Sequence, residues 1–147
     1  MTFDASIEME NGPGKVIVRV TEEVHISQAR RAARAMTDAM GLKRTAAFHL
    51  TISVSELASN LWFHALRGGT ITLSPIQMDG RVGMEVTAED HGPGIADVGK
   101  ALEDGFSTGG GLGGGLPGVM RLMDEFEIQS TLGIGTRIVT RKWQTLR

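Results

Sequence analysis

The chain has 147 residues, a length typical of one domain, of which 41% are hydrophobic and 22% charged. A formal net charge of −2 argues against generic nucleic-acid binding, and the lack of cysteine excludes disulfide frameworks and cysteine-based metal sites. The N-terminus has no signal-peptide pattern, and no apolar stretch approaches the roughly 18 residues of a membrane helix. We therefore expect a cytoplasmic protein with neither nucleic acid nor a membrane as partner.

The N-terminal third of the chain predicts a strand followed by an alanine-rich helix. Alternating β-branched residues predict the strand at residues 15–20, paired with residues 7–10 across the turn cluster at 11–14. Alanine and methionine then recur at helical spacing over residues 27–40, and Gly41 is a natural C-cap.

A longer helix and a hairpin follow. Apolar residues predict the helix over residues 44–66, before two glycines end it. Strands at 70–77 and 81–89 flank Asp79-Gly80, which is a hairpin turn signal. Pro75 inside the first of these strands indicates an edge position or a bulge.

The C-terminal third mixes turns with short elements. Residues 90–111 are turn-rich, with a short helix near 98–102. A helix at 116–123 and strands at 126–130 and 136–141 complete the chain. Antiparallel strands with helices set apart in sequence predict an α+β fold, an α/β sandwich with one mixed, mostly antiparallel sheet and helices on one face. With no internal repeat or linker, residues 1–147 should form a single domain.

Three polar or glycine-rich motifs occur in order, and the first lies inside the long helix. Glu56, Asn60 and His64 are spaced four residues apart, so they share one helical face. A carboxylate and an amide oxygen on a face that packs against a sheet suit a proton acceptor and a hydrated Mg²⁺, which prefers oxygen ligands. For this helix alone, an exposed polar stripe is an equal interpretation.

The second motif, Asp90-His91-Gly92-Pro93-Gly94, directly follows a predicted strand. An acid at a strand end can accept a hydrogen bond from an exocyclic amine such as that of adenine. Gly92 and Gly94 would let the backbone pass close to a flat ring, where a Cβ would clash. Taken alone, the motif is better interpreted as a tight turn.

The third motif is a glycine-rich run that leads into a helix. Backbone N–H groups and the positive end of the helix dipole form an anion site suited to phosphates. Three other interpretations fit less well. A flexible linker would not be followed at once by a packed helix. A Walker A loop would end in Gly-Lys-Ser/Thr, and a Rossmann loop would lie within a βαβ unit, and neither feature is present here. The residues are Gly109, Gly110, Gly111, Leu112, Gly113, Gly114, Gly115 and Leu116.

In this order the motifs resemble the Bergerat (GHKL) ATP-binding superfamily, whose hallmarks are an Asn-bearing helix, an Asp-x-Gly-x-Gly turn, a glycine-rich lid and a late Gly-Thr pair. The lid corresponds to about residues 91–115, and the late pair to Gly135-Thr136. The runs at 54–60 and 111–126, with the terminal Lys142-Trp143, are most similar to switch serine/threonine kinases of the RsbT type, close to RsbW-type anti-sigma kinases.

The resemblance implies a serine/threonine protein kinase that uses ATP and Mg²⁺. Glu56 would be the general base for the substrate hydroxyl, and Asn60 would bind the Mg²⁺ that bridges the phosphates. The implied nucleotide contacts are Asp90 for the adenine amine, Gly92 and Gly94 for the ring, the glycine run for the phosphates, and Thr136 for adenine through water.

The resemblance also implies partners. They are an STAS-domain substrate (RsbS-like), a related scaffold (RsbR-like), and a downstream phosphatase or other output protein that the released kinase activates in a stressosome pathway. From the residues themselves, Arg30, Arg31 and Arg34 form a candidate docking face on the first predicted helix, with a solvated surface as an equal interpretation.

Two other functions fit the same motifs. The first is a non-catalytic binding module, an anti-sigma or partner-switch protein that uses ATP as a structural ligand. Glu56 favours catalysis over this alternative, because a binding module needs Asn60 but no base. The second is a detached histidine-kinase ATPase domain, which is less favoured because no upstream dimerisation helix carries a phospho-accepting histidine.

Overall fold

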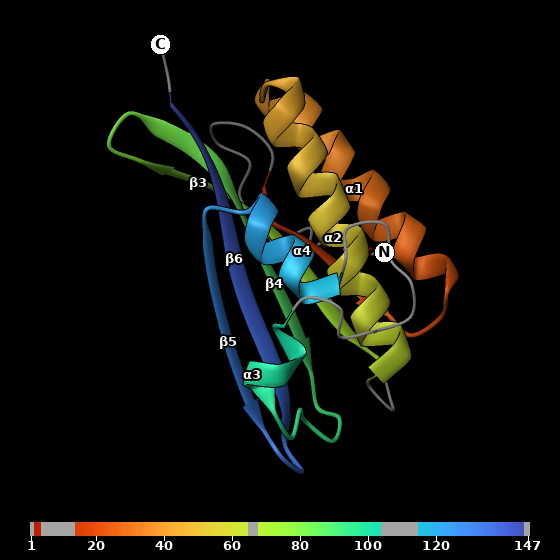
Figure 1. The fold of residues 1–147 in the computed structure, drawn as a ribbon. Helices are drawn as coiled ribbons and strands as arrows, with labels where there is room; N and C mark the ends of the chain where they lie inside the picture. Colours follow the sequence, from red (N-terminus) through yellow and green to blue (C-terminus); the bar gives the residue numbers. More distant parts are fainter. Residues whose placement is uncertain (1, 4–13, 65–67, 104–114, 146–147) are drawn as a thin grey trace.

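The computed structural model describes residues 2–3, 14–64, 68–103 and 115–145 as one sheet with helices on one face (Figure 1). Six strands follow the order β1-β2-β3-β4-β6-β5, and each described pairing is antiparallel. The α+β prediction is thereby confirmed, with a fully antiparallel sheet among these residues. The strands are β1 Thr2–Phe3, β2 Val16–Val20, β3 Gly69–Met78, β4 Arg81–Asp90, β5 Glu125–Thr131 and β6 Gly135–Thr145.

Two long helices and two short ones complete the described fold: α1 Val24–Met40, α2 Arg44–His64, α3 Val98–Ala101 and α4 Gly115–Leu122. Gly41 ends α1 in the left-handed conformation, with φ of 69°, as its sequence position predicted. None of these helices combines the length and apolar character needed to cross a lipid bilayer.

The hairpin between β3 and β4 follows the sequence prediction. Asp79 and Gly80 have positive φ angles of 49° and 76°, as a tight primed turn requires. Pro75 pairs with Met84 of β4 but lies beyond Leu73, where the pairing of β3 with β2 ends. Among the described residues Pro75 is therefore at an edge position, one of the two possibilities that the sequence indicated. The expected pairing of residues 7–10 lies outside the described residues.

The core forms where one face of the sheet meets the helices. Alternate residues of the strands point to the helical layer, and small alanines on α1 let that helix approach α2 and β2 closely. Burial of this apolar surface is the main force that fixes the ends of α2 and β4 side by side. Its fully buried members include Val18, Ala29, Ala33, Leu50, Val54, Leu57, Ile71, Leu73, Val86 and Val119.

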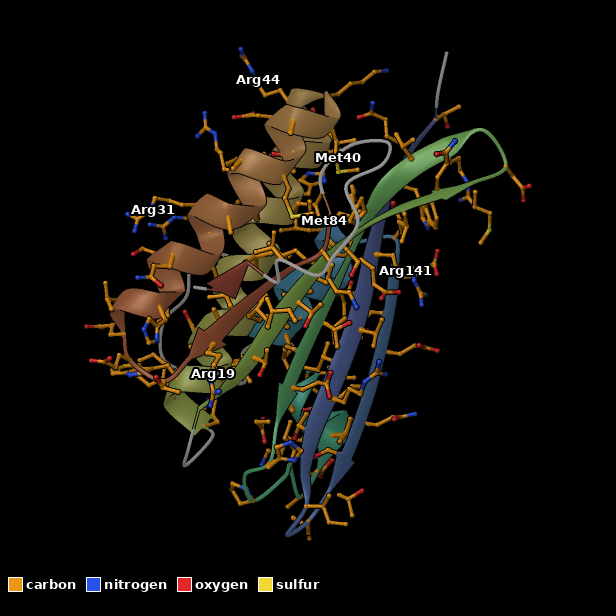
Figure 2. The ribbon with its side chains drawn as sticks, turned by 180° about the vertical axis from the view of Figure 1, so that it is seen from behind. Arg19, Arg31, Met40, Arg44, Met84 and Arg141 are labelled. Atoms are coloured by element: carbon orange, nitrogen blue, oxygen red, sulfur yellow. The ribbon has the colours of Figure 1, made fainter. Side chains whose placement is uncertain are left out.

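The other face of the sheet carries paired charges rather than helices, as Figure 2 shows for Arg141. The Arg141 guanidinium donates through Nε to Glu85 and through Nη1 to Glu125, each at 2.8 Å. Hydrogen bonds from the Trp143 indole and from Arg141 lower the pKa of Glu125. This network keeps the uncovered face polar and pairs one guanidinium with two carboxylates across three neighbouring strands.

His49 is a half-buried histidine of α2 whose Nδ1 is sealed from solvent without a hydrogen-bond partner in the described part of the chain. Its pKa is lowered below 6.5, first by burial and then by the positive charge of Lys142, although Asp124 acts in the opposite direction. The folded state therefore favours the neutral imidazole.

This shift predicts a pH-dependent stability. His49 contributes stability that is fully present above its unfolded pKa, near 6.5, and is lost as the pH falls through the lower folded pKa. We expect His49→Gln to lose less unfolding free energy than wild type between about pH 7.5 and about pH 5.5. Urea unfolding at both pH values measures this difference, and parallel losses in the two proteins would contradict it.

Candidate functional site

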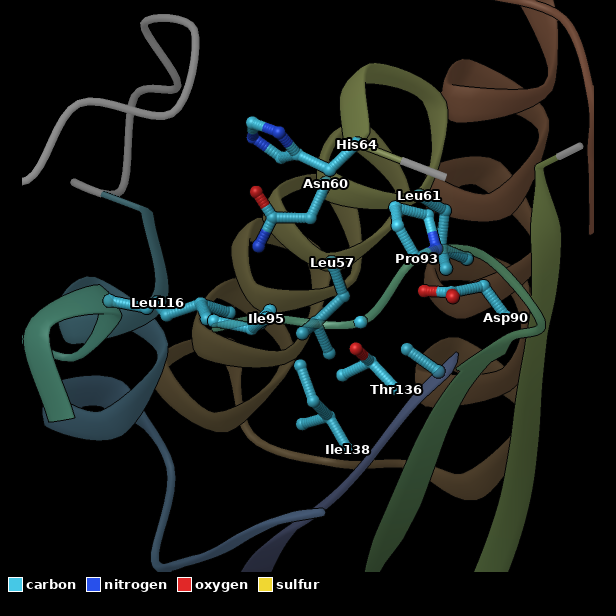
Figure 3. A pocket seen from close by; sticks show the side chains of 13 residues that line it. Leu57, Asn60, Leu61, His64, Asp90, Pro93, Ile95, Leu116, Thr136 and Ile138 are labelled. Atoms are coloured by element: carbon cyan, nitrogen blue, oxygen red, sulfur yellow. The ribbon is translucent and has the colours of Figure 1, made fainter. Parts of the chain in front are cut away.

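A pocket of about 350 Å³ opens at the end of the sheet where β4 and β6 meet α2 (Figure 3). Its floor and walls are mainly apolar, and polar groups stand on two opposite sides. This volume and composition suit a small organic ligand with a flat apolar part. The lining residues are Leu57, Asn60, Leu61, His64, Ala88, Asp90, Pro93, Gly94, Ile95, Ala101, Leu116, Thr136 and Ile138.

Asp90 is the last residue of β4, and its carboxylate lies on one side of the pocket (Figure 3). Its Oδ1 accepts a hydrogen bond from the Gly92 N–H at 2.8 Å, which fixes the carboxylate in place. Gly92, expected to admit a ring, does not line the pocket. Its observed contact is instead this hydrogen bond to Asp90.

The loop that carries Pro93 and Gly94 rests on the turn between β5 and β6. The Gly133 N–H donates to the Pro93 carbonyl at 3.0 Å. Gly94 has a φ of 79°, and a Cβ there would stand 2.5 Å from the Thr131 carbonyl oxygen. Gly135 is equally constrained, because a Cβ there would stand 2.1 Å from the Asp90 carbonyl oxygen. Both glycines are needed for the close backbone packing that shapes this side.

Ser130 of β5 connects three parts of the site. Its Oγ accepts a hydrogen bond from the Ile95 N–H at 2.7 Å and lies 2.7 Å from the hydroxyl of Thr136. Thr136 itself pairs directly opposite Asp90 in the β4–β6 register. Sequence reasoning missed Ser130. The available signal was its position two residues after Ile128, which places a polar residue on the inward face of β5.

The hydroxyl pair has two possible proton arrangements. If Ser130 donates to Thr136, the Thr136 proton is left for an acceptor in the pocket. If Thr136 donates to Ser130, the Ser130 proton can reach the Gly135 carbonyl at 3.4 Å, and Thr136 offers only lone pairs to the pocket. In both arrangements the Thr136 hydroxyl can still form a hydrogen bond with a ligand or a bridging water, as donor in the first arrangement and as acceptor in the second.

The opposite side of the pocket is formed by the C-terminal half of α2. Asn60 and His64 line the pocket one helical turn apart, across from Asp90 (Figure 3). Glu56 lies one turn before Asn60, is only 4% exposed, and does not line the described pocket. It is the one ionisable side chain among the buried residues of the described chain.

The predicted glycine motif is described only at its end. Residues 109–114 lie outside the described part, so their phosphate-binding role stays a prediction. Gly115 starts α4 with a φ of 69° and is buried, and Leu116 lines the pocket.

A metal ion in this pocket would need oxygen atoms from a ligand. The described residues contain no group of three or more His, Cys, Asp or Glu side chains that could hold an ion. Asn60 supplies one amide oxygen at the pocket surface, which fits a Mg²⁺ that is completed by phosphate oxygens and water.

Comparison with known proteins agrees with this arrangement. The model of the histidine kinase-like ATPase domain family matches residues 18–142. The serine/threonine-protein kinase RsbT of Bacillus subtilis is 44% identical over 126 residues, which are 86% of this chain and 94% of that protein. An anti-sigma F factor of Caldanaerobacter subterraneus is 35% identical over 96 residues, covering 62% of this chain and 66% of that protein.

Solved structures support the fold. The mycobacterial sensor histidine kinase MprB superposes with a TM-score of 0.51 at 21% identity, covering 69% of this chain and 74% of that chain. A nucleotide-free form of the catalytic domain of histidine kinase ThkA has a TM-score of 0.50 at 13% identity and covers 90% of this chain and 99% of that chain.

The Ser130 contacts generate a test of how this side of the pocket is held. Ser130→Ala leaves the Ile95 N–H without its acceptor, so we expect a loss of about 1–3 kcal/mol in unfolding free energy. Hydrogen exchange at the Ile95 amide should become faster. The exposed neighbour Thr131→Ala is the control and should change neither quantity. Unaltered Ile95 exchange in Ser130→Ala would contradict the connecting role of Ser130.

Proposed function

The chain belongs to the histidine kinase-like ATPase domain family and, within it, to the RsbT group, and from this we propose that it is a serine/threonine protein kinase that transfers the γ-phosphate of ATP to a regulatory protein. The position of Glu56 carries the proposal. Carboxylates are rarely buried in folded proteins. A buried carboxylate one turn from the pocket residue Asn60 is therefore a specific feature, and a base is what transfer to a hydroxyl group needs.

The pocket supports adenine at the Asp90 end. The carboxylate, held through Oδ1, can accept from the exocyclic amine with its other oxygen. The ring would lie between apolar side chains such as Leu57 and Ile138, beside the tightly packed Gly94. Thr136, opposite Asp90, would bind adenine directly or through a water. Base recognition thus uses groups that β4 and β6 already hold in register.

The transfer step follows from the groups on α2. The hydroxyl oxygen of the substrate serine or threonine attacks the γ-phosphorus while its proton passes to the Glu56 carboxylate. The bond from the γ-phosphorus to the β–γ bridging oxygen breaks, and ADP leaves with that electron pair. Asn60 would hold a Mg²⁺ that neutralises charge on the phosphate oxygens. Positioning and charge neutralisation account for most of the catalysis in such transfers.

The protein substrate we propose is an STAS-domain protein of the RsbS type, with an RsbR-type scaffold as a second partner. The relatives named above, an RsbT kinase and an anti-sigma F factor, support an exchange between regulatory proteins. Release from the scaffold would let this chain activate a downstream output protein as part of a stressosome pathway. The proposed setting is the cytoplasm.

A groove between α1 and α2 fits the docking of an acidic protein surface. It has a volume of about 490 Å³ and is lined by Arg30, Arg31 and Arg34 together with Asp38 and Thr51. None of the three arginines forms an ion pair with another described residue. Figure 2 shows Arg31 pointing away from the helical layer. Unpaired guanidinium groups on a chain of net charge −2 favour a partner that presents carboxylates.

A second candidate function is a non-catalytic partner-binding module that keeps ATP as a structural ligand. The similarity to an anti-sigma F factor supports it. The two functions differ in what Glu56 is needed for, because a binding module requires the pocket but no proton acceptor.

The kinase proposal predicts a selective loss in Glu56→Gln. The amide cannot accept the hydroxyl proton, so transfer should fall by about 10²–10⁴-fold while ATP affinity stays close to wild type. Transfer of labelled γ-phosphate to an STAS-domain protein from the same genome measures the first quantity, and calorimetry measures the second. Near wild-type transfer would reject Glu56 as the base. Tight ATP binding without transfer in either protein would favour the binding module.

The docking proposal predicts a charge effect that depends on position. Arg31→Glu should raise the KM for the STAS-domain protein by about tenfold, because it places a like charge against an acidic surface. Arg19→Glu on the uncovered sheet face makes the same change in net charge and should leave KM near wild type. Equal effects of the two substitutions would indicate only long-range electrostatics, and no effect of Arg31→Glu would reject the groove.

A further inference from the structure

We propose that His64 binds the terminal phosphates of the nucleotide and so determines the preference of this pocket for a triphosphate. The inference rests on the proposed ATP site and adds to it a residue that the proposed transfer step does not use. It is based on where His64 lies relative to the two polar sides of the pocket.

The two polar sides of the pocket have different chemistry. Asp90 and Thr136 offer a carboxylate and a hydroxyl, which suit the donors and acceptors of a base. Asn60 and His64 stand across the apolar floor from Asp90 (Figure 3). A nucleotide whose amine meets Asp90 therefore extends its phosphates toward Asn60 and His64.

On the side of the pocket formed by Asn60 and His64, His64 is the residue that can contribute positive charge. Among the described lining residues, His64 is the only one whose side chain can carry a positive charge, and the remaining ones are apolar, neutral or, for Asp90, acidic. A nucleoside triphosphate carries several negative charges that need neutralisation. An imidazole donates an N–H to a phosphate oxygen when neutral and adds a full charge when protonated.

The position of His64 on α2 favours contact with the outer phosphates. It is the last described residue of α2 and is solvent-exposed, whereas Asn60, one turn earlier, is half-buried. The helix thus presents its polar groups in order from the buried Glu56 to the exposed His64. A ligand atom that His64 reaches lies nearer the mouth of the pocket than one that Asn60 reaches, as the end of a triphosphate would.

The test compares ligands that share a base and differ in phosphate number. Binding of adenosine, AMP, ADP and ATP, each with Mg²⁺, is measured by calorimetry for wild type, His64→Ala and His64→Arg. We expect His64→Ala to weaken ATP binding by about tenfold, the size of one charge-assisted hydrogen bond, and to leave adenosine binding unchanged. His64→Arg should restore ATP binding. Phe48→Ala is the control, since Phe48 is an exposed aromatic residue of the same helix that does not line the pocket.

Other results reject the inference in distinguishable ways. Equal losses for adenosine and ATP in His64→Ala would place His64 on the base side or in the fold, and unchanged ATP binding would remove it from the site. A loss in His64→Ala that His64→Arg fails to restore would argue against a charge contact. Wild type that binds neither adenosine nor ATP would reject the nucleotide pocket itself.

Discussion

The antiparallel register of β4 with β6 is the constraint on which the site depends. It sets Asp90 directly opposite Thr136, so the acid and the hydroxyl meet without help from any flexible segment. The register is fixed from both sides of the sheet, by apolar residues packed under the helices and by the Arg141 ion pairs on the uncovered face. A one-residue slip of β6 against β4 would turn Thr136 to the other face of the sheet, away from Asp90 and the pocket.

The turn between β5 and β6 also fixes the neighbouring loop, which carries Gly94 and Ile95. Close backbone contacts at Gly94 and Gly135, and the hydroxyl of Ser130, bind that loop to the sheet. The Asp90 side of the pocket is consequently held by several close backbone contacts and hydrogen bonds. The α2 side is held differently, by the burial of Leu57 and Leu61 against the strands. The two sides of one pocket thus derive their positions from different kinds of interaction.

Much of the fold could be predicted because local signals and burial agreed. The Asp79-Gly80 turn, the Gly41 cap and the edge position of Pro75 each depend on near neighbours in sequence, and all three were found where expected. Asp90, Asn60 and Thr136 meet in one pocket as the motif order implied. The features that sequence analysis missed are contacts between residues far apart in the sequence. Ser130 matters through a loop 35 residues away, and no local pattern encodes that distance.

Gly92 illustrates a second limit of sequence reasoning. Gly92 was expected to let the backbone pass close to a ring, but it does not line the pocket, and its backbone N–H donates to Asp90 instead. Glu56 was expected to share a face with Asn60 and His64, yet only the latter two reach the pocket surface. Four-residue spacing advances around a helix by about 40° each time. The first and last members of the series therefore differ in depth, which spacing alone does not reveal.

The division of the pocket between strands and a single helix has an evolutionary consequence. Under the proposed function, recognition of the base would be distributed over β4, β5, β6 and the loop that follows β4, so few single substitutions could alter it without harming the fold. The chemistry beyond the base would then be concentrated at three positions of α2, each on its own helical turn. Relatives could therefore exchange catalysis for simple retention of a nucleotide, or one acceptor for another, by point changes along one helix while inheriting the same adenine site unaltered.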